Sequence, residues 1–200
     1  MAAVSGAQLR AFARQIGTEA SNTHMGERNY LIEGVSCSGK TMVCRELKRR
    51  GYHAINGDTE LAYPGDPLTG EPINPIMNES LGVQSHEYHF WDTGKVRTLA
   101  ADQSHAATFF CGGSRNFSAF IDVFDRVFVL DIDRTTLDRR LAERTASEWG
   151  GREAERQLIR RLHATKEDVP TNGVPIDATA PLQRVVDQIL QSCDIVRIHD

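Results

Sequence analysis

The sequence predicts an α/β protein with a central parallel sheet of about five strands and helices on both faces. Short apolar runs suited to buried strands occur at residues 30–32, 52–55, 108–111, 127–130 and 174–177. Helix-compatible segments separate them, and strands that alternate with helices form a parallel sheet covered on both sides. The chain has 200 residues, which fits one domain with a substantial core.

The bulk composition excludes several classes of protein. Hydrophobic residues make up 40% of the chain and charged residues 25%, which is typical of a globular protein. A formal net charge of −4 argues against broad nucleic-acid binding, and no apolar run approaches the roughly eighteen residues that span a bilayer. Cys37, Cys44, Cys111 and Cys193 lie far apart, which is typical of a reduced, intracellular protein. We therefore expect a cytoplasmic protein.

Residues 1–28 form an N-terminal extension, and residues 29–200 are expected to form a single domain. Residues 7–16 are compatible with a short helix that bears Arg10 and Arg14, with no acid before Glu19. This composition faintly resembles an organellar transit peptide within residues 1–24. We prefer the interpretation that these residues are an extension without a targeting role, and a transit peptide is the alternative.

The first strand, residues 30–32, leads into a glycine-rich loop that reads G-x-x-x-x-G-K-T and then into a helix-compatible run. In this context the glycines let backbone N–H groups point at phosphate oxygens, and the helix N-terminus adds partial positive charge. We predict nucleotide binding by Gly34, Val35, Ser36, Cys37, Ser38, Gly39, Lys40 and Thr41, together called the phosphate loop. Lys40 is expected to reach the β- and γ-phosphates of ATP or GTP, and the Thr41 hydroxyl to bind Mg²⁺. The disfavoured alternative is a glycine-rich turn with a surface lysine.

The second strand, residues 52–55, ends in Asn56, Gly57 and Asp58. Ligands of parallel sheets bind beyond the C-terminal ends of the strands, so this cluster is expected to face the phosphate loop. Asp58 is predicted to accept a hydroxyl proton from a substrate, or to help hold Mg²⁺ through water. The alternative is an aspartate that caps a helix or a turn.

The third strand, residues 108–111, ends in a second cluster at the same edge of the predicted sheet. Gly112 and Gly113 are predicted to let a substrate approach the backbone closely, and Arg115 to grip an anionic or polar group. The alternatives, a tight turn and a solvated charge, stay open.

An acceptor-side loop of residues 59–92 separates these two strands. It carries Pro64, Pro67, Pro72 and Pro75, which favour irregular structure up to residue 82. A helix is predicted over residues 86–101. His86 and His89 are three residues apart, which is a weak metal signal, so a surface or substrate-pocket role is preferred.

Helices are predicted in the second half of the chain over residues 116–123, capped by Asn116, and over residues 135–145, 152–164 and 181–191, with a final strand at residues 195–198. Arg140 and Arg144 lie four residues apart, hence on one face of the second of these helices. Such a pair can neutralise charge on a transferring phosphoryl group. The double glycine at residues 150–151 is a candidate hinge for a lid of residues 144–156. The alternative for the arginines of these helices is a structural one, in which arginine and glutamate side chains pair on a solvent-exposed helix face.

From residue 28 to residue 190, the chain resembles the nucleoside-monophosphate-kinase-like branch of P-loop kinases, which includes adenylate, shikimate and gluconate kinases. The phosphate loop carries the specific part of the resemblance. Arg140 and Arg144 resemble the R-x-x-x-R start of an adenylate-kinase lid, and Asn56-Gly57-Asp58 resembles the D-x-D of shikimate kinases with its first aspartate replaced. Residues 176–179 resemble the segment beside the adenine ring, which implies that Asp177 contacts the nucleotide. Arg140 is expected to contact the nucleotide as well.

The resemblance implies a three-layer α/β/α P-loop NTPase fold with a lid and an acceptor-side insertion. It also implies an ATP- and Mg²⁺-dependent kinase, monomeric or homodimeric, in which Lys40, Asp58, Arg140 and Arg144 act on a small-molecule hydroxyl or phosphate. A nucleotide switch or ATPase that controls a partner protein is the alternative. A nucleic-acid end kinase is disfavoured because residues 56–92 contain no arginine or lysine.

Overall fold

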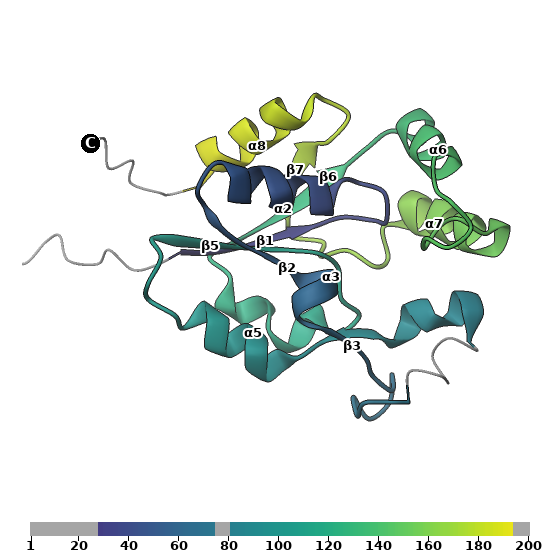
Figure 1. Cartoon of the computed structure of the whole chain (residues 1–200), viewed down its shortest axis with the longest axis horizontal. Coiled ribbons are helices and arrows are strands. Elements are labelled where there is room, and N and C mark those ends of the chain that lie inside the picture. The colour runs from purple at the N-terminus through teal and green to yellow at the C-terminus, as the bar shows by residue number, and fades with distance from the viewer. Residues whose placement is uncertain (1–27, 75–80, 194–200) are drawn as a thin grey trace, which may run out of the picture.

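A five-stranded parallel sheet forms the centre of the molecule in the computed structural model, which describes residues 28–74 and 81–193 (Figure 1). Its strands are β1 (Arg28–Glu33), β2 (His53–Asn56), β5 (Ala107–Cys111), β6 (Arg126–Asp131) and β7 (Val174–Asp177). Their order is β2-β5-β1-β6-β7, and all neighbouring pairs are parallel. The predicted parallel sheet is confirmed. The expected helix at residues 7–16 and the expected strand at residues 195–198 lie outside the described residues.

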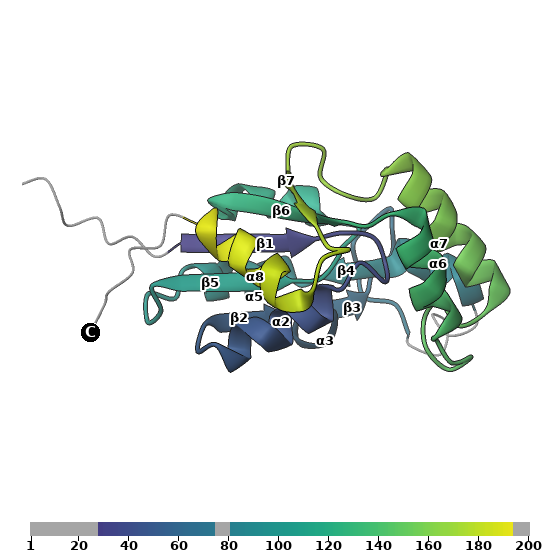
Figure 2. The ribbon, with the colours of Figure 1, turned by 90° about the horizontal axis from the view of Figure 1, so that it is seen from above.

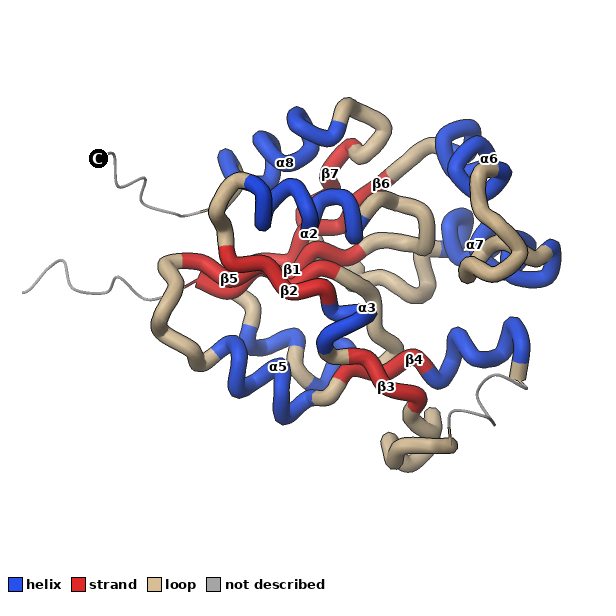
Figure 3. Tube along the Cα trace, in the orientation of Figure 1, coloured by secondary structure: helices blue, strands red, loops and turns tan. Residues whose placement is uncertain are grey.

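Helices cover both faces of this sheet, as Figures 1 and 3 show. On one face lie α2 (Lys40–Arg49) and α8 (Leu182–Gln191). On the other lie α5 (Thr93–Ala100) and two short 3-10 helices, η2 (Phe117–Ala119) and η3 (Ile121–Val123). Figure 2 shows that β1 points toward the end of the molecule where α6 (Arg134–Ala142) and α7 (Glu153–Thr165) lie. None of the helices in the described part of the chain is both long and apolar enough to cross a bilayer.

Successive residues of β1 point to opposite faces of the sheet and supply two separate cores. Tyr30 and Ile32 join the cluster under α2 and α8, whereas Leu31 joins the cluster under α5. Both sides of the strand are therefore apolar, as expected for a central parallel strand covered by helices. The same alternation places Glu33, the last residue of β1, on the α5 side of the sheet edge.

The prediction of one helix over residues 86–101 is wrong. The chain there forms a 3-10 helix, η1 (Gly82–Tyr88), then β4 (His89–Trp91), and only then α5. The strand β4 pairs antiparallel with β3 (Ala62–Pro64), so the acceptor-side loop contains a small sheet of its own. Asp92 starts α5 because its side chain accepts a hydrogen bond of 3.0 Å from the Lys95 N–H.

The predicted helix over residues 116–123 is also wrong, because two 3-10 turns occupy this segment. Asn116 precedes η2, but its side chain makes no capping hydrogen bond there. Its side chain accepts a 2.9 Å hydrogen bond from the Trp91 N–H and donates one of 2.9 Å to the Trp91 carbonyl. The amide thus fastens the loop after β5 to β4.

The helix α6 ends at Ala142, earlier than the predicted residue 145, and this changes the position of Arg144. Glu148 accepts hydrogen bonds from the backbone N–H and the hydroxyl of Thr145, and these contacts form a turn in place of further helix. Arg144 therefore follows α6 instead of sharing a helix face with Arg140. The expected lid, residues 144–156, comprises this turn and the start of α7.

Candidate nucleotide and acceptor site

The phosphate loop joins β1 to α2, and its backbone requires glycine at two positions. Gly34 has a φ of 149°, and a Cβ there would lie 2.7 Å from the Leu130 carbonyl. Gly39 has a φ of 113° and immediately precedes α2. Side chains rarely adopt these angles, so glycine allows the loop to curl in front of the helix N-terminus. The loop thereby has the shape of an anion-binding cradle.

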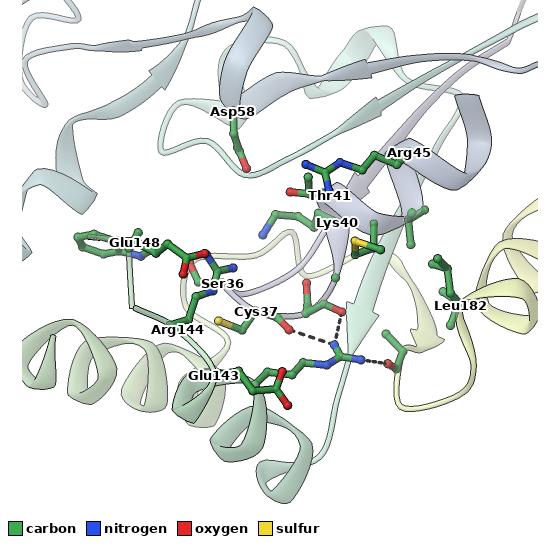
Figure 4. Close-up of a pocket in the computed structure, with 18 of the residues that line it drawn as sticks. Ser36, Cys37, Lys40, Thr41, Arg45, Asp58, Glu143, Arg144, Glu148 and Leu182 are labelled. Carbon is green, nitrogen blue, oxygen red and sulfur yellow. Dashed lines mark hydrogen bonds and ion pairs between the residues drawn. The ribbon is translucent and has the colours of Figure 1, made fainter. Parts of the chain in front are cut away.

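Lys40, the first residue of α2, folds back over this cradle. Its Nζ donates hydrogen bonds to the carbonyls of Gly34 at 2.5 Å and Val35 at 3.2 Å. Figure 4 shows Lys40 and Thr41 directed into a cavity that Asp58 enters from the opposite side. A cation in this position can neutralise phosphate oxygens held by the loop.

The larger of two cavities at this end of the sheet has a volume of about 740 Å³. Residues 36–41 form its floor, and Arg144, Glu148 and Trp149 from the lid form one wall. Ala178, Ala180, Leu182 and Val185, which follow β7 or lie in α8, form an apolar wall. The cavity therefore has two halves, one floored by the phosphate loop and one bounded by an apolar wall.

Arg140 lies between these halves and contacts the backbone on both sides. Its guanidinium donates hydrogen bonds to the carbonyls of Cys37 at 3.0 Å, Ser38 at 2.8 Å and Ala178 at 2.9 Å (Figure 4). Burial, together with the neighbouring charge of Arg139, lowers its pKa. The arginine therefore ties the phosphate loop to the segment after β7. This contact differs from the expected role in neutralising a transferring phosphoryl group.

Arg144 and Asp177 occupy different positions relative to the larger cavity. Arg144 lines it and lies 3.4 Å from Glu148 Oε1, so its guanidinium is held at the cavity wall. The Oδ1 of Asp177 accepts hydrogen bonds from the backbone and hydroxyl of Thr179, and Asp177 is not part of the cavity lining. Its neighbour Ala178 lines the cavity instead, so the predicted nucleotide contact by the Asp177 side chain has no support from the geometry.

A smaller cavity of about 310 Å³ adjoins the first. Lys40 and Asp58 line both cavities, as do Ser36 and Trp149. Asp58 Oδ1 accepts a 3.2 Å hydrogen bond from the Gly113 N–H and lies 3.4 Å from His89 Nε2. Burial alone would raise the pKa of Asp58, but the hydrogen bond from His89 and the charge of Lys40 hold it below its usual value. Asp58 is therefore an ionised carboxylate where the two cavities meet.

The three residues predicted beyond β5 differ in their surroundings. Gly113 and Arg115 line the smaller cavity. Gly112 is not part of that lining, and a Cβ there would lie 2.6 Å from the Trp91 ring and 2.7 Å from Asp58 Oδ1. Gly112 is thus required by the packing of Trp91 and Asp58.

Sequence reasoning missed Glu33, a carboxyl group that is only 2% exposed and lines the smaller cavity. Its Oε2 accepts a 2.7 Å hydrogen bond from the Gly34 N–H. Burial raises the pKa of Glu33 to about 8, although Lys40 and the Gly34 N–H oppose the shift. The available signal was an acidic residue at the end of an otherwise apolar strand, directly before the phosphate loop.

Asp168, which lies between α7 and β7, and Ser114 also line the smaller cavity and were missed. Asp168 is 7% exposed, and its Oδ2 lies 3.6 Å from Arg115 and 3.7 Å from His86 Nε2. Trp149 stacks on His86 with ring centroids 5.9 Å apart. No local motif marks Asp168, because it reaches the cavity only through the path of the chain after α7.

The residues present fit a Mg²⁺ ion held mainly by phosphate oxygens and water. Thr41 presents its hydroxyl at the phosphate loop, and Asp58 lines the same cavity. Within residues 28–74 and 81–193, no three His, Cys, Asp or Glu side chains cluster closely enough to hold a metal by themselves. Mg²⁺ is usually bound by one or two protein groups plus substrate phosphates, so this sparse donor set suits it. Asn56 Oδ1 is buried without a hydrogen-bond partner, outside the lining of either cavity.

Comparison with solved structures identifies the architecture. A shikimate kinase from Bacteroides thetaiotaomicron superposes with a TM-score of 0.55 at 13% identity, covering 82% of this chain and 97% of that one. A sugar kinase from Janibacter sp. HTCC2649 gives a TM-score of 0.52 at 18% identity, covering 85% and 96%. The fold is that of the P-loop small-molecule kinases.

A third structure with this fold, deoxyadenosine kinase from M. mycoides with bound dATP, gives a TM-score of 0.51 at 15% identity. It covers 81% of this chain and 97% of that chain. No protein-family model matches the sequence, and neither does any curated protein. At identities of 13–18% the likeness establishes the fold of this chain, and its chemistry must be argued from its own cavities.

Proposed function

We propose that this protein is an ATP-dependent kinase that transfers a phosphoryl group to a small-molecule acceptor. The observation that carries the proposal is that Lys40 and Asp58 line both cavities. A nucleotide in the larger cavity and an acceptor in the smaller one would therefore meet between a lysine cation and a carboxylate. This is the arrangement that in-line phosphoryl transfer requires.

The nucleotide occupies the larger cavity. The phosphate loop amides and Lys40 hold the phosphates, and the apolar wall of Ala178, Ala180 and Leu182 packs on the base. Arg140 keeps this wall and the loop in register through its three carbonyl contacts. Arg144 lies at the lid wall of the cavity, from where its charge can stabilise the transferring group.

The acceptor occupies the smaller cavity with a hydroxyl directed at Asp58. Because the pKa of Asp58 is lowered, its carboxylate is ionised at neutral pH and can accept a hydrogen bond from the attacking hydroxyl. The hydrogen bond from Gly113 fixes the direction of the carboxylate. Glu33 stabilises the start of the phosphate loop by accepting a hydrogen bond from the Gly34 N–H.

Thr41 and Asp58 are the residues that would hold Mg²⁺, the first directly and the second through water. When bound, the ion neutralises the phosphate charge that builds up during transfer. The loss of Thr41 is therefore expected to weaken binding of Mg·ATP more than binding of ATP without the ion. Calorimetric titration of Thr41→Ala with ATP, in the presence and absence of Mg²⁺, measures this difference directly.

The deciding experiment measures ADP production from Mg·ATP, alone and with a panel of nucleosides, nucleotides, sugars and hydroxy acids, using Lys40→Met protein as the blank. Turnover that depends on an acceptor supports the kinase. Turnover without any acceptor, or tight ATP binding without turnover, would instead indicate a nucleotide switch or ATPase.

A further inference from the structure

Asp168 has an unpaired oxygen in the wall of the smaller cavity. Its Oδ2 lies 3.6 Å from the Arg115 guanidinium and 3.7 Å from His86 Nε2, but its Oδ1 is shielded from solvent and has no hydrogen-bond partner. The residue is only 7% exposed. A buried carboxylate oxygen without a donor is unfavourable, so this atom favours a ligand that supplies one. A ligand hydroxyl that donated to this carboxylate would form a charge-assisted hydrogen bond.

The charges around this cavity disfavour an anionic acceptor. Two carboxylates line it, Asp58 and Asp168, against the two cations Lys40 and Arg115, whereas the raised pKa of Glu33 keeps this third acid protonated at neutral pH. In the proposed function Lys40 binds the nucleotide phosphates, and the Arg115 guanidinium is already paired with the Asp168 carboxylate. A carboxylate or phosphate on the acceptor would therefore meet acidic groups without a free cation.

The histidines of the cavity do not supply the missing charge. Burial, with Arg115 nearby, lowers the pKa of His86 to about 4, so this ring is neutral at pH 7. The His89 ring is directed at Asp58 Oδ1. Ser85 and Ser114 also line the cavity and add no charge to it. The wall as a whole is suited to hydroxyl groups.

The size of the cavity limits the acceptor further. A volume of about 310 Å³ is at the small end of pockets that bind small molecules. Trp149 stacks on His86 and lines both cavities, so an acceptor must fit beside these rings and below the nucleotide. A compact molecule with several hydroxyl groups satisfies both the volume and the polar lining.

We propose that the acceptor is an uncharged polyhydroxylated molecule of about monosaccharide size, and that Asp168 selects it by accepting one of its hydroxyl hydrogen bonds and by keeping Arg115 from anions. This inference rests on the proposed kinase function and adds its substrate class. Asp168 is a specificity-determining residue, whereas Asp58 faces the attacking hydroxyl.

Matched pairs of compounds test the charge class. Acceptor-dependent ADP production is measured with D-glucitol against D-gluconate, D-ribose against ribose 5-phosphate, and D-glucose against glucose 6-phosphate. The expected result is turnover with a neutral member and at least tenfold lower kcat/KM for its anionic counterpart. Preferential turnover of anionic members would overturn the substrate class and leave the kinase intact. ATP hydrolysis that no acceptor stimulates would overturn the kinase function and this inference with it.

Asp168→Asn tests the residue itself. The variant keeps the size of the side chain but removes its charge and releases Arg115. With the preferred neutral acceptor, KM is expected to rise roughly tenfold to a hundredfold while kcat changes little. The ratio of kcat/KM for the neutral compound of each pair to that for its anionic counterpart should also fall. A merely structural role for Asp168 would leave this ratio unchanged.

Asp122→Asn is the matched control, because Asp122 also faces an arginine, Arg97 at 2.9 Å, but is exposed and lies outside both cavities. Thermal unfolding of both variants checks the fold. An unchanged ratio of neutral to anionic turnover in folded Asp168→Asn would overturn the role of Asp168. Binding of the acceptor pairs to the ATP-analogue complex, measured by calorimetry, gives the same comparison without turnover.

Discussion

The backbone N–H of Gly113 donates a 3.2 Å hydrogen bond to Asp58 Oδ1, although the two residues are 55 positions apart in the sequence. The contact joins the ends of β2 and β5, which are neighbours in the sheet. It orients the Asp58 carboxylate toward the space above the phosphate loop, where both cavities meet. The separate polar clusters at two strand ends are thus parts of one site.

Replacement of Lys40 is expected to abolish phosphotransfer without unfolding the protein. The Nζ contacts only loop carbonyls, so Lys40→Met removes a charge from the cavity and leaves the core intact. ADP production with the preferred acceptor measures the loss, and circular dichroism checks the fold. Lys48→Met, on the same helix but half-exposed and paired with Glu60, should retain activity. Retained turnover in Lys40→Met would remove the phosphate loop from the mechanism.

Asp58→Asn is expected to lower kcat by roughly 10²- to 10⁴-fold, because the amide cannot accept the proton of an attacking hydroxyl. The KM for ATP should change far less, since the loop and Lys40 hold the phosphates. Steady-state kinetics with both substrates varied separates the two effects. Glu60→Gln provides the control, because Glu60 lies on the same short helix, α3 (Gly57–Glu60), outside both cavities. A collapse of ATP affinity in Asp58→Asn would assign Asp58 to the metal site instead.

Glu33 is expected to make the stability of the protein depend on pH. Burial raises its pKa from 4.5 to about 8, so between these values the folded protein holds a proton that the unfolded chain has released. The free energy of unfolding should therefore fall as pH rises through this window, by up to about 1.4 kcal/mol per pH unit. Glu33→Gln keeps an acceptor for the Gly34 N–H, but its side chain cannot titrate. The free energy of unfolding of this variant should therefore fall less than that of the wild type as pH rises through the window.

Urea denaturation of wild type and Glu33→Gln, at intervals from about pH 5 to about pH 8, measures the difference in slope. Other groups titrate equally in both proteins, so the difference reports Glu33 alone. Parallel curves would show that Glu33 is ionised in the folded protein throughout this range.

Arg140 is expected to contribute both stability and nucleotide affinity. Arg140→Ala leaves the carbonyls of Cys37, Ser38 and Ala178 without this donor, which should destabilise the fold by about 1–3 kcal/mol. ATP binding should weaken as well, because the loop is no longer tied to the segment after β7. Arg140→Lys should recover little of the lost stability or ATP affinity. An ammonium group lacks the planar fork with which the guanidinium reaches three carbonyls.

Chemical denaturation and titration with a fluorescent ATP analogue measure these two losses. The neighbouring Arg139→Ala is the control, because Arg139 is exposed and its side chain does not line the larger cavity. Equal stability and equal affinity for the ATP analogue in the two variants would contradict the proposal that Arg140 ties the phosphate loop to the segment after β7.

The sequence by itself predicted the parallel sheet and the phosphate loop, because both depend on local signals. Short apolar runs between helix-compatible segments indicate buried strands. The spacing from Gly34 to Thr41 indicates a loop whose geometry is set by a few neighbouring residues. Asp58 was found because strand ends in parallel sheets have a known place relative to ligands. These inferences needed no knowledge of distant contacts.

Tertiary structure alone decided the remaining parts. The amide of Asn116 fastens Trp91 from 25 residues away, so residues 116–123 lose the predicted helix. Asp168 meets Arg115 across the site, and Glu33 acquires its raised pKa only because the fold buries it beside the phosphate loop. Burial and charge pairing between distant segments are properties of the packed chain. Local patterns therefore predicted where a nucleotide binds, whereas the packing of distant loops shapes the cavity that selects the acceptor.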